Sequence, residues 1–233
     1  MRSCSARIEP HDLGGVLSLD IQHNLLRPPN RVVKRVTDLL VGGIATIVAG
    51  PIIVLAALWI KAVSRGSDFY RQEREGRGGR PIHILKLRTM YPGAETMLER
   101  HLDENPEARA EWDQFCKLRN DPRILPGIGR FLRRTSLDEL PQLINILRGD
   151  MSLVGPRPFP IYHNNRLDED FRTLRLQVTP GLTGLWQIMV CSDGNLDAQE
   201  SLDSYYVRNW SLWLDIYILI RTVRVVINTH GAY

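Results

Sequence analysis

The sequence predicts a helix-rich α+β protein that one apolar segment anchors to a membrane. Three observations lead to this prediction: an uncharged run over residues 39–60, two short strand-like runs over 68–90, of which the second alternates apolar and polar from 82 to 88, and scattered apolar residues typical of helices in much of the remainder. We therefore expect a lead-in segment over 1–30, a membrane helix over 31–65 and a polar domain over 66–233.

The membrane segment is long enough to cross a bilayer as one straight helix, because about 20 apolar residues suffice. Two features favour a helix that enters, bends and returns. Gly50 and Pro51 lie in its middle, and proline kinks or breaks a helix. Basic residues flank it on both sides, at 34–35 and 61–65, and basic flanks favour the cytoplasm.

The polar domain should begin with two strands joined by a glycine-rich turn, followed by helices over 93–118, 127–134 and 137–148. Residues 211–227 are amphipathic and contain tryptophan, which is typical of a helix at a membrane interface. An ordinary core helix fits that pattern equally well, and the sequence leaves both alternatives open.

The composition limits the classes of partner and of metal or disulfide site to expect, and it does not identify the partner. The net charge of +4 suits phosphate substrates, anionic lipid or nucleic acid alike. The three cysteines, Cys4, Cys116 and Cys191, are far apart, which argues against a disulfide framework or a zinc site.

Two adjacent acids, Asp138 and Glu139, follow Arg133 and Arg134 and are the strongest candidates for chemistry. The structural alternative is a capping box, in which Ser136 and Glu139 cap a helix. In the functional interpretation, one carboxylate attacks phosphorus while its neighbour binds Mg²⁺. The arginines would then neutralise phosphate groups.

The block from 135 to 158, TSLDELPQLINILRGDMSLVGPRP, resembles the signature of the bacterial sugar transferases. These are the monotopic phosphoglycosyl transferases that initiate O-antigen, capsule and exopolysaccharide synthesis. The resemblance extends over residues 30–233 and includes the stretches KRVTDL, FYRQER, ILKLRTM, TPGLTGLWQ and YYVRNWSLWLD.

The resemblance implies that Asp138 attacks the β-phosphate of a UDP-sugar, that UMP leaves, and that undecaprenyl phosphate accepts the sugar phosphate. It assigns Glu139 to Mg²⁺ and Gly50–Pro51 to the bend of a re-entrant helix-break-helix. It places the catalytic domain at the cytoplasmic face of the bacterial inner membrane. The lead-in resembles the larger hexose-1-phosphate members, whose extra N-terminal helices and soluble domain we expect this chain to lack.

Other residues are candidates for the same site. Lys86 and Arg88 alternate along one strand and could bind phosphate, although a solvated strand edge is the alternative. Arg157 lies between two prolines and is a candidate anion contact. Asp203 matches a polar position that the family uses near its active site.

The expected partners are a UDP-sugar, undecaprenyl phosphate and membrane lipid, without nucleic acid; a homodimer is left open. Residues 188–192 depart from the family pattern, where a basic residue is expected. A non-catalytic, membrane-tethered binding protein, or a degraded paralogue, therefore stays as the alternative. The sequence does not identify the sugar or the polysaccharide.

Overall fold

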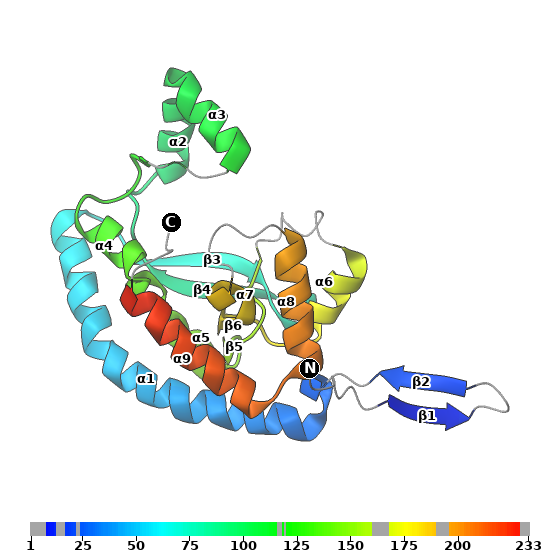
Figure 1. Cartoon of the computed structure of the whole chain (residues 1–233). Helices are drawn as coiled ribbons and strands as arrows, with labels where there is room; N and C mark the ends of the chain where they lie inside the picture. Colours follow the sequence, from blue (N-terminus) through cyan, green and yellow to red (C-terminus); the bar gives the residue numbers. More distant parts are fainter. Residues whose placement is uncertain are drawn as a thin grey trace.

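The fold is described here from a computed structural model, which covers residues 8–12, 17–21, 24–115, 118, 120–159, 168–189 and 196–228 (Figure 1). Helices predominate, as the sequence predicts. In chain order the elements are β1 (Ile8–Asp12), β2 (Leu17–Ile21), η1 (Asn24–Leu26), α1 (Pro28–Val63), β3 (Phe69–Glu75), η2 (Arg77–Gly79), β4 (Pro81–Leu87), α2 (Ala94–Glu104), α3 (Pro106–Phe115), α4 (Ile128–Arg134), η3 (Leu137–Glu139), α5 (Gln142–Arg148), β5 (Ser152–Val154), α6 (Glu169–Leu176), β6 (Gly181–Thr183), α7 (Leu185–Met189), α8 (Leu196–Asn209) and α9 (Leu212–Asn228).

Helix α1 holds the predicted membrane segment. It has 36 residues and stays helical through Gly50 and Pro51, so the break predicted there is not an interruption of the helix. Figure 1 shows α1 running beneath α9 and α5 and then bending upward toward α4. Proline removes one backbone donor and crowds the preceding turn, which permits a bend while the other helical hydrogen bonds persist.

One face of α1 packs on the domain and the rest is apolar and exposed. Small buried residues, Gly42, Ala49 and Ala56, face the interior, and Gly42 approaches α5 closely. Within the described residues, α1 is the one helix whose length and composition would allow it to cross a membrane. Its large exposed apolar side chains are Val32, Val33, Val36, Leu39, Leu40, Val41, Ile44, Ile47, Val48, Ile52, Val54, Leu55, Leu58, Trp59 and Val63.

The start of α1 is fixed to the domain by the basic residues that the sequence places before the apolar run. The buried Lys34 Nζ lies 2.8 Å from Asp215 Oδ2 in α9. Arg35 donates hydrogen bonds of 2.6 and 2.8 Å to the carbonyl oxygens of Ile146 and Leu147 in α5. The cationic side chain thus binds carbonyl oxygens near the C-terminal end of that helix, where positive charge is favourable.

The described strands form three two-stranded sheets. Strands β3 and β4 make the predicted antiparallel hairpin, with Phe69 opposite Leu87 and Glu75 opposite Pro81. The lead-in contains a second hairpin, β1–β2, that the sequence reasoning did not predict. The third sheet, β5–β6, is parallel, with Ser152 opposite Gly181 and Val154 opposite Thr183.

Glycines allow the backbones around β5 and β6 to approach closely. A Cβ on Gly181 would lie 2.1 Å from the nitrogen of Gly155, and one on Gly184 would lie 2.6 Å from the Gly155 oxygen. A side chain at either position would therefore push these segments apart.

Helix α9 has one buried face and one exposed apolar face. Asp215 and Ile218 are buried against the core. Trp213, Tyr217 and Ile220 remain exposed on the other face, at the spacing of an amphipathic helix.

Candidate active site

The adjacent acids Asp138 and Glu139 lie on η3, a single 3₁₀ turn between α4 and α5. Ser136, which precedes this turn, has φ of 54°, a left-handed conformation that is uncommon for serine. Its side chain makes no capping hydrogen bond, so the capping-box alternative is wrong. Only the backbones join here, where the Glu139 amide donates to the Ser136 oxygen at 3.2 Å. The side chain of Glu139 is therefore free to turn toward other partners.

Glu139 is the acceptor for two cations. Lys86 Nζ lies 2.6 Å and Arg157 Nη2 lies 3.0 Å from the same oxygen, Glu139 Oε1. Burial alone would raise the pKa of Glu139, but Arg157 and Lys86 outweigh it and lower the pKa to about 2. Glu139 is thus ionised at neutral pH, and the structure joins β4, η3 and the loop after β5 through one carboxylate.

The neighbouring Asp138 has the opposite electrostatic balance. Burial raises its pKa to about 6, and the negative charge of Glu139 adds to the rise. Lys86 and Arg133 oppose that shift by favouring the ionised form. At pH 7, a group with a pKa of about 6 is roughly nine-tenths ionised, so Asp138 is a carboxylate that is poorly solvated. Such an oxygen is suited to nucleophilic attack.

Arg133 interacts electrostatically with Asp138, whereas Lys86 and Arg157 are the cations that pair with Glu139. Its Nε donates a 2.9 Å hydrogen bond to Thr89 Oγ1, which orients the guanidinium at the end of α4. Its positive charge acts on Asp138. The contact with substrate phosphate that the sequence predicts for Arg133 stays a prediction.

A small cavity of about 10 Å³ opens beside Glu139. That space holds about one water molecule, so a nucleotide sugar would have to lie over the cavity or widen it. The sequence reasoning missed two of its polar lining residues, Arg74 and Gln142. Gln142 lies within the signature that carries the acid pair, so the sequence held a signal for it. Arg74 lies in β3, where neither sequence nor burial alternates, so no local pattern distinguishes it. The lining residues are Arg74, Ile84, Lys86, Glu139, Gln142, Arg157, Pro158, Gly181 and Leu182.

Arg88 is not brought to the acid pair. It is buried, and its guanidinium donates to the carbonyl oxygens of Ser64 at 3.0 Å and Arg65 at 2.8 Å. These carbonyls lie just beyond the last turn of α1. Position 88 lies beyond the end of β4, so the strand alternation that joins Lys86 to the site does not extend to Arg88. The structure therefore gives Arg88 a role in fixing the end of α1.

Asp203 is buried in α8. Its charge interacts with Arg175, and Arg175 in turn contacts the backbone of Arg157 in the site. Burial raises the pKa of Asp203 to about 7 against the opposing charge of Arg175. Arg175 donates a hydrogen bond to the backbone oxygen of Arg157, and its guanidinium lies 4.0 Å from the ring centroid of Phe159. The sequence reasoning did not select Arg175, because nothing local distinguishes it from a surface arginine of α6.

The carboxylates of this site could bind Mg²⁺ if the diphosphate of the substrate lies beside them. Magnesium takes one or two carboxylates together with water and substrate phosphates. Glu139 is ionised and only its Oε1 is engaged by cations, and Asp138 adjoins it. No described cluster of three or more acids, histidines or cysteines is present. Because Lys86 and Arg157 already offset the negative charges of the two acids, the metal would need the substrate diphosphate beside it.

Comparison with known proteins places this site in a family. The family model for bacterial sugar transferases matches residues 29–229. The undecaprenyl-phosphate galactose phosphotransferase of Salmonella typhimurium is 43% identical over 219 residues, which are 94% of this chain and 45% of that protein. The exopolysaccharide production protein ExoY of Rhizobium meliloti is 39% identical over 208 residues, which are 89% of this chain and 91% of that protein.

A third relative, the UDP-glucose:undecaprenyl-phosphate glucose-1-phosphate transferase of Escherichia coli, is 36% identical over 220 residues, which are 91% of this chain and 44% of that protein. The chain thus spans a little under half the length of several curated relatives and nearly the whole length of others. Because the matched region includes α1, the acid pair and α9, the chain belongs to the bacterial sugar transferase family.

Proposed function

We propose that this chain transfers a hexose 1-phosphate from a UDP-sugar to undecaprenyl phosphate and so initiates the synthesis of a polysaccharide. Relatives whose names state this type of transfer cover most of the chain. The observation that carries the proposal is the unequal acid pair: two cations hold Glu139 ionised, while Asp138 beside it is poorly solvated and forms no ion pair within the part of the chain that the structure describes. Two different roles follow from two different environments.

The first step is attack by an Asp138 carboxylate oxygen on the β-phosphorus of the donor. A bond forms between that oxygen and phosphorus, and the bond from phosphorus to the bridging oxygen breaks, so UMP leaves with that oxygen. The product on the enzyme is an acyl phosphate that carries the sugar. Lys86, Arg133 and Arg157 lie close enough to the acids to offset the charge of the diphosphate.

In the second step, a phosphate oxygen of undecaprenyl phosphate attacks the same phosphorus. The bond to Asp138 breaks, which restores the carboxylate and leaves a sugar diphosphate linked to the lipid. A covalent intermediate suits two substrates that arrive from water and from the membrane, because they need not be bound together. Where Mg²⁺ is bound, Glu139 would hold it, and it would supply positive charge to the phosphate oxygens while Asp138 stays free to attack.

A re-entrant placement of α1 at the cytoplasmic face of the inner membrane is part of the proposal. The support is that one polar domain fixes both ends of the helix: Lys34 pairs with Asp215 near its start, and Arg88 binds Ser64 at its end. A straight helix of this length would be about 54 Å long, and the hydrocarbon core is about 30 Å thick. Since a polar domain cannot follow a helix through a bilayer, both ends belong on one side.

The test is to trap the intermediate. The purified chain is incubated with a panel of UDP-sugars and Mg²⁺ without lipid acceptor, and its peptides are analysed by mass spectrometry. We expect a hexose-phosphate adduct on the peptide that contains Asp138, stoichiometric UMP release, and neither in Asp138→Asn. An adduct on Glu139, or full turnover in Asp138→Asn, would overturn the mechanism. Binding of a UDP-sugar without any UMP release would favour the non-catalytic alternative.

A further inference from the structure

A second cavity, of about 480 Å³, lies between the start of α1, the turn η2 and the end of α6. None of its lining residues belongs to the cavity beside Glu139. It is much the larger of the two, and nothing in the transfer chemistry uses it. Its lining residues are Arg31, Arg77, Gly78, Thr173, Leu176 and Gln177.

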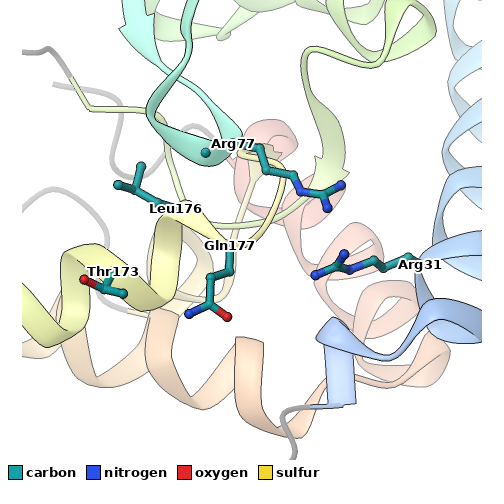
Figure 2. A pocket seen from close by; sticks show the side chains of 6 residues that line it. Arg31, Arg77, Thr173, Leu176 and Gln177 are labelled. Carbon is teal, nitrogen blue, oxygen red and sulfur yellow. The ribbon is translucent and has the colours of Figure 1, made fainter.

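Two arginines from distant parts of the sequence converge on this cavity. Figure 2 shows the guanidinium groups of Arg31 and Arg77 turned toward one another, with the side-chain amide of Gln177 nearby. Among the described residues, neither guanidinium forms an ion pair with a carboxylate. Like charges that face each other repel, and the positive end of the α1 dipole adds to the potential. A bound anion would remove that repulsion.

The fold holds both arginines in place. Arg77 occupies a tight turn in which Gly78 and Gly79 have φ of 71° and 73°, values that favour glycine, and this turn packs against α6. A Cβ on Gly76 would lie 2.6 Å from Ile82, so the turn also needs a glycine where it leaves β3. Arg31 lies one helical turn before the buried Lys34, whose ion pair fixes this part of α1.

The cavity lies where the apolar surface of α1 begins. Val32 and Val33, directly after Arg31, are 63% and 43% exposed, and the exposed apolar side chains continue along the helix. An anion between the two arginines would therefore sit at the boundary of the surface that we place in the membrane. Head groups of phospholipids occupy that depth of a bilayer.

We propose that Arg31 and Arg77 form a phosphate-binding site, separate from the acid pair, at the lipid boundary of α1. Guanidinium groups bind phosphate oxygens in pairs of charge-assisted hydrogen bonds, and the side-chain amide of Gln177 supplies a neutral donor. Either an anionic phospholipid or free inorganic phosphate has this chemistry. The inference rests on the placement of α1 at a membrane and not on the identity of the nucleophile.

The experiment uses the whole chain in phosphatidylcholine nanodiscs. In one arm phosphatidylglycerol replaces part of the phosphatidylcholine; in the other, sodium phosphate is compared with sodium chloride at equal ionic strength. The rise in melting temperature with each probe gives its apparent affinity. We expect Arg31→Gln and Arg77→Gln to weaken binding about tenfold or more, as loss of a charge-assisted bond implies. Arg80→Gln removes the same charge from an exposed position next to η2 and serves as the matched control.

A rise that depends on phosphatidylglycerol assigns the site to a lipid, and an equal rise with inorganic phosphate assigns it to the free ion. Arg77→Glu gives Arg31 a carboxylate partner, so it should stay folded and lose the response to both probes. The proposal is overturned if Arg31→Gln and Arg77→Gln respond as the unaltered chain does, or if Arg80→Gln loses as much. UMP release in detergent should be unchanged in Arg77→Gln, which separates a failure here from a failure of the transferase mechanism.

Discussion

Lys86 Nζ lies 2.6 Å from Glu139 Oε1. Arg157, in the loop after β5, contacts the same oxygen. The ion pair between Lys86 and Glu139 joins the β3–β4 hairpin to the turn that carries the acids, across 53 residues of sequence. It is partly buried, so water screens it less than a surface pair. The contact therefore both orders the site and sets the charge of Glu139.

Removing the cation at position 86 should harm the site more than the fold. In Lys86→Met, the pKa of Glu139 should rise because one of its two cations is lost. We expect kcat/KM for the UDP-sugar to fall about 10²-fold, the range for loss of one electrostatic contact. Steady-state kinetics measure this, with Arg71→Met, an exposed position on the paired strand, as the control. Equal losses in both variants would contradict the assignment.

The pH dependence of UMP release should report Asp138. Its pKa is raised to about 6, so protonation removes the nucleophile as the pH falls through that value, and release should decline below about pH 6. In Glu139→Gln the neighbouring negative charge is gone, and the pKa of Asp138 should fall. The midpoint of the acidic decline should then move to lower pH, even though the rate is slower. A rapid-quench UMP burst measures both midpoints, and an unchanged midpoint would refute the electrostatic account.

The carboxyl of Asp203 should make stability depend on pH. Its pKa in the folded chain is raised to about 7 from the ordinary value of 3.8 for an aspartate. Between these values the folded state binds more protons than the unfolded state, so stability falls as the pH rises to about 7 and then levels off. Asp203→Asn should remove this decline and exceed the unaltered chain in melting temperature at pH 8. Asp113→Asn, at an exposed position of α3, should leave the pH dependence unchanged.

The ion pair between Lys34 and Asp215 should be required for α1 to dock on α9. Lys34→Met leaves a buried carboxylate whose remaining side-chain donors, among the residues that the structure describes, are Tyr206 and Trp210. Breaking one side of a buried pair costs about 3–5 kcal/mol, and the remaining donors favour the lower end. Chemical unfolding in detergent measures the loss. The double variant Lys34→Met with Asp215→Asn should recover part of it, and purely additive losses would show that the pair is not coupled.

Pro51 should be needed for the bend of α1. Pro51→Leu supplies the missing donor, so the helix should straighten toward a full span and activity should fall. Cysteines placed just before residue 39 and just after residue 60 test this in spheroplasts with an impermeant reagent. Both should be protected in the parent, and one should be labelled in Pro51→Leu. Gly43→Ala, whose Cβ meets no other atom, is the control. Labelling of one end in the parent would refute the re-entrant placement.

The site shows which inferences a sequence supports and which it does not. Asp138, Glu139 and Arg157 lie within one continuous signature, so local sequence was enough to select them together. Lys86 was found by strand alternation, but the same reasoning selected Arg88, whose guanidinium binds carbonyls at the end of α1. The capping box was also a reasonable local inference, and the left-handed backbone of Ser136 excludes it.

The sequence by itself determined the apolar helix, the β3–β4 hairpin, the short helices around the acids and the family. These features depend on periodicity, turn residues and a contiguous motif, all of which act over a few neighbouring positions. The tertiary structure alone decided the parallel β5–β6 pair, the role of Arg175 and the meeting of Arg31 with Arg77. Each of these depends on segments far apart in the chain. Their proximity is set by how α1, α6 and α8 pack, and no local pattern records that packing.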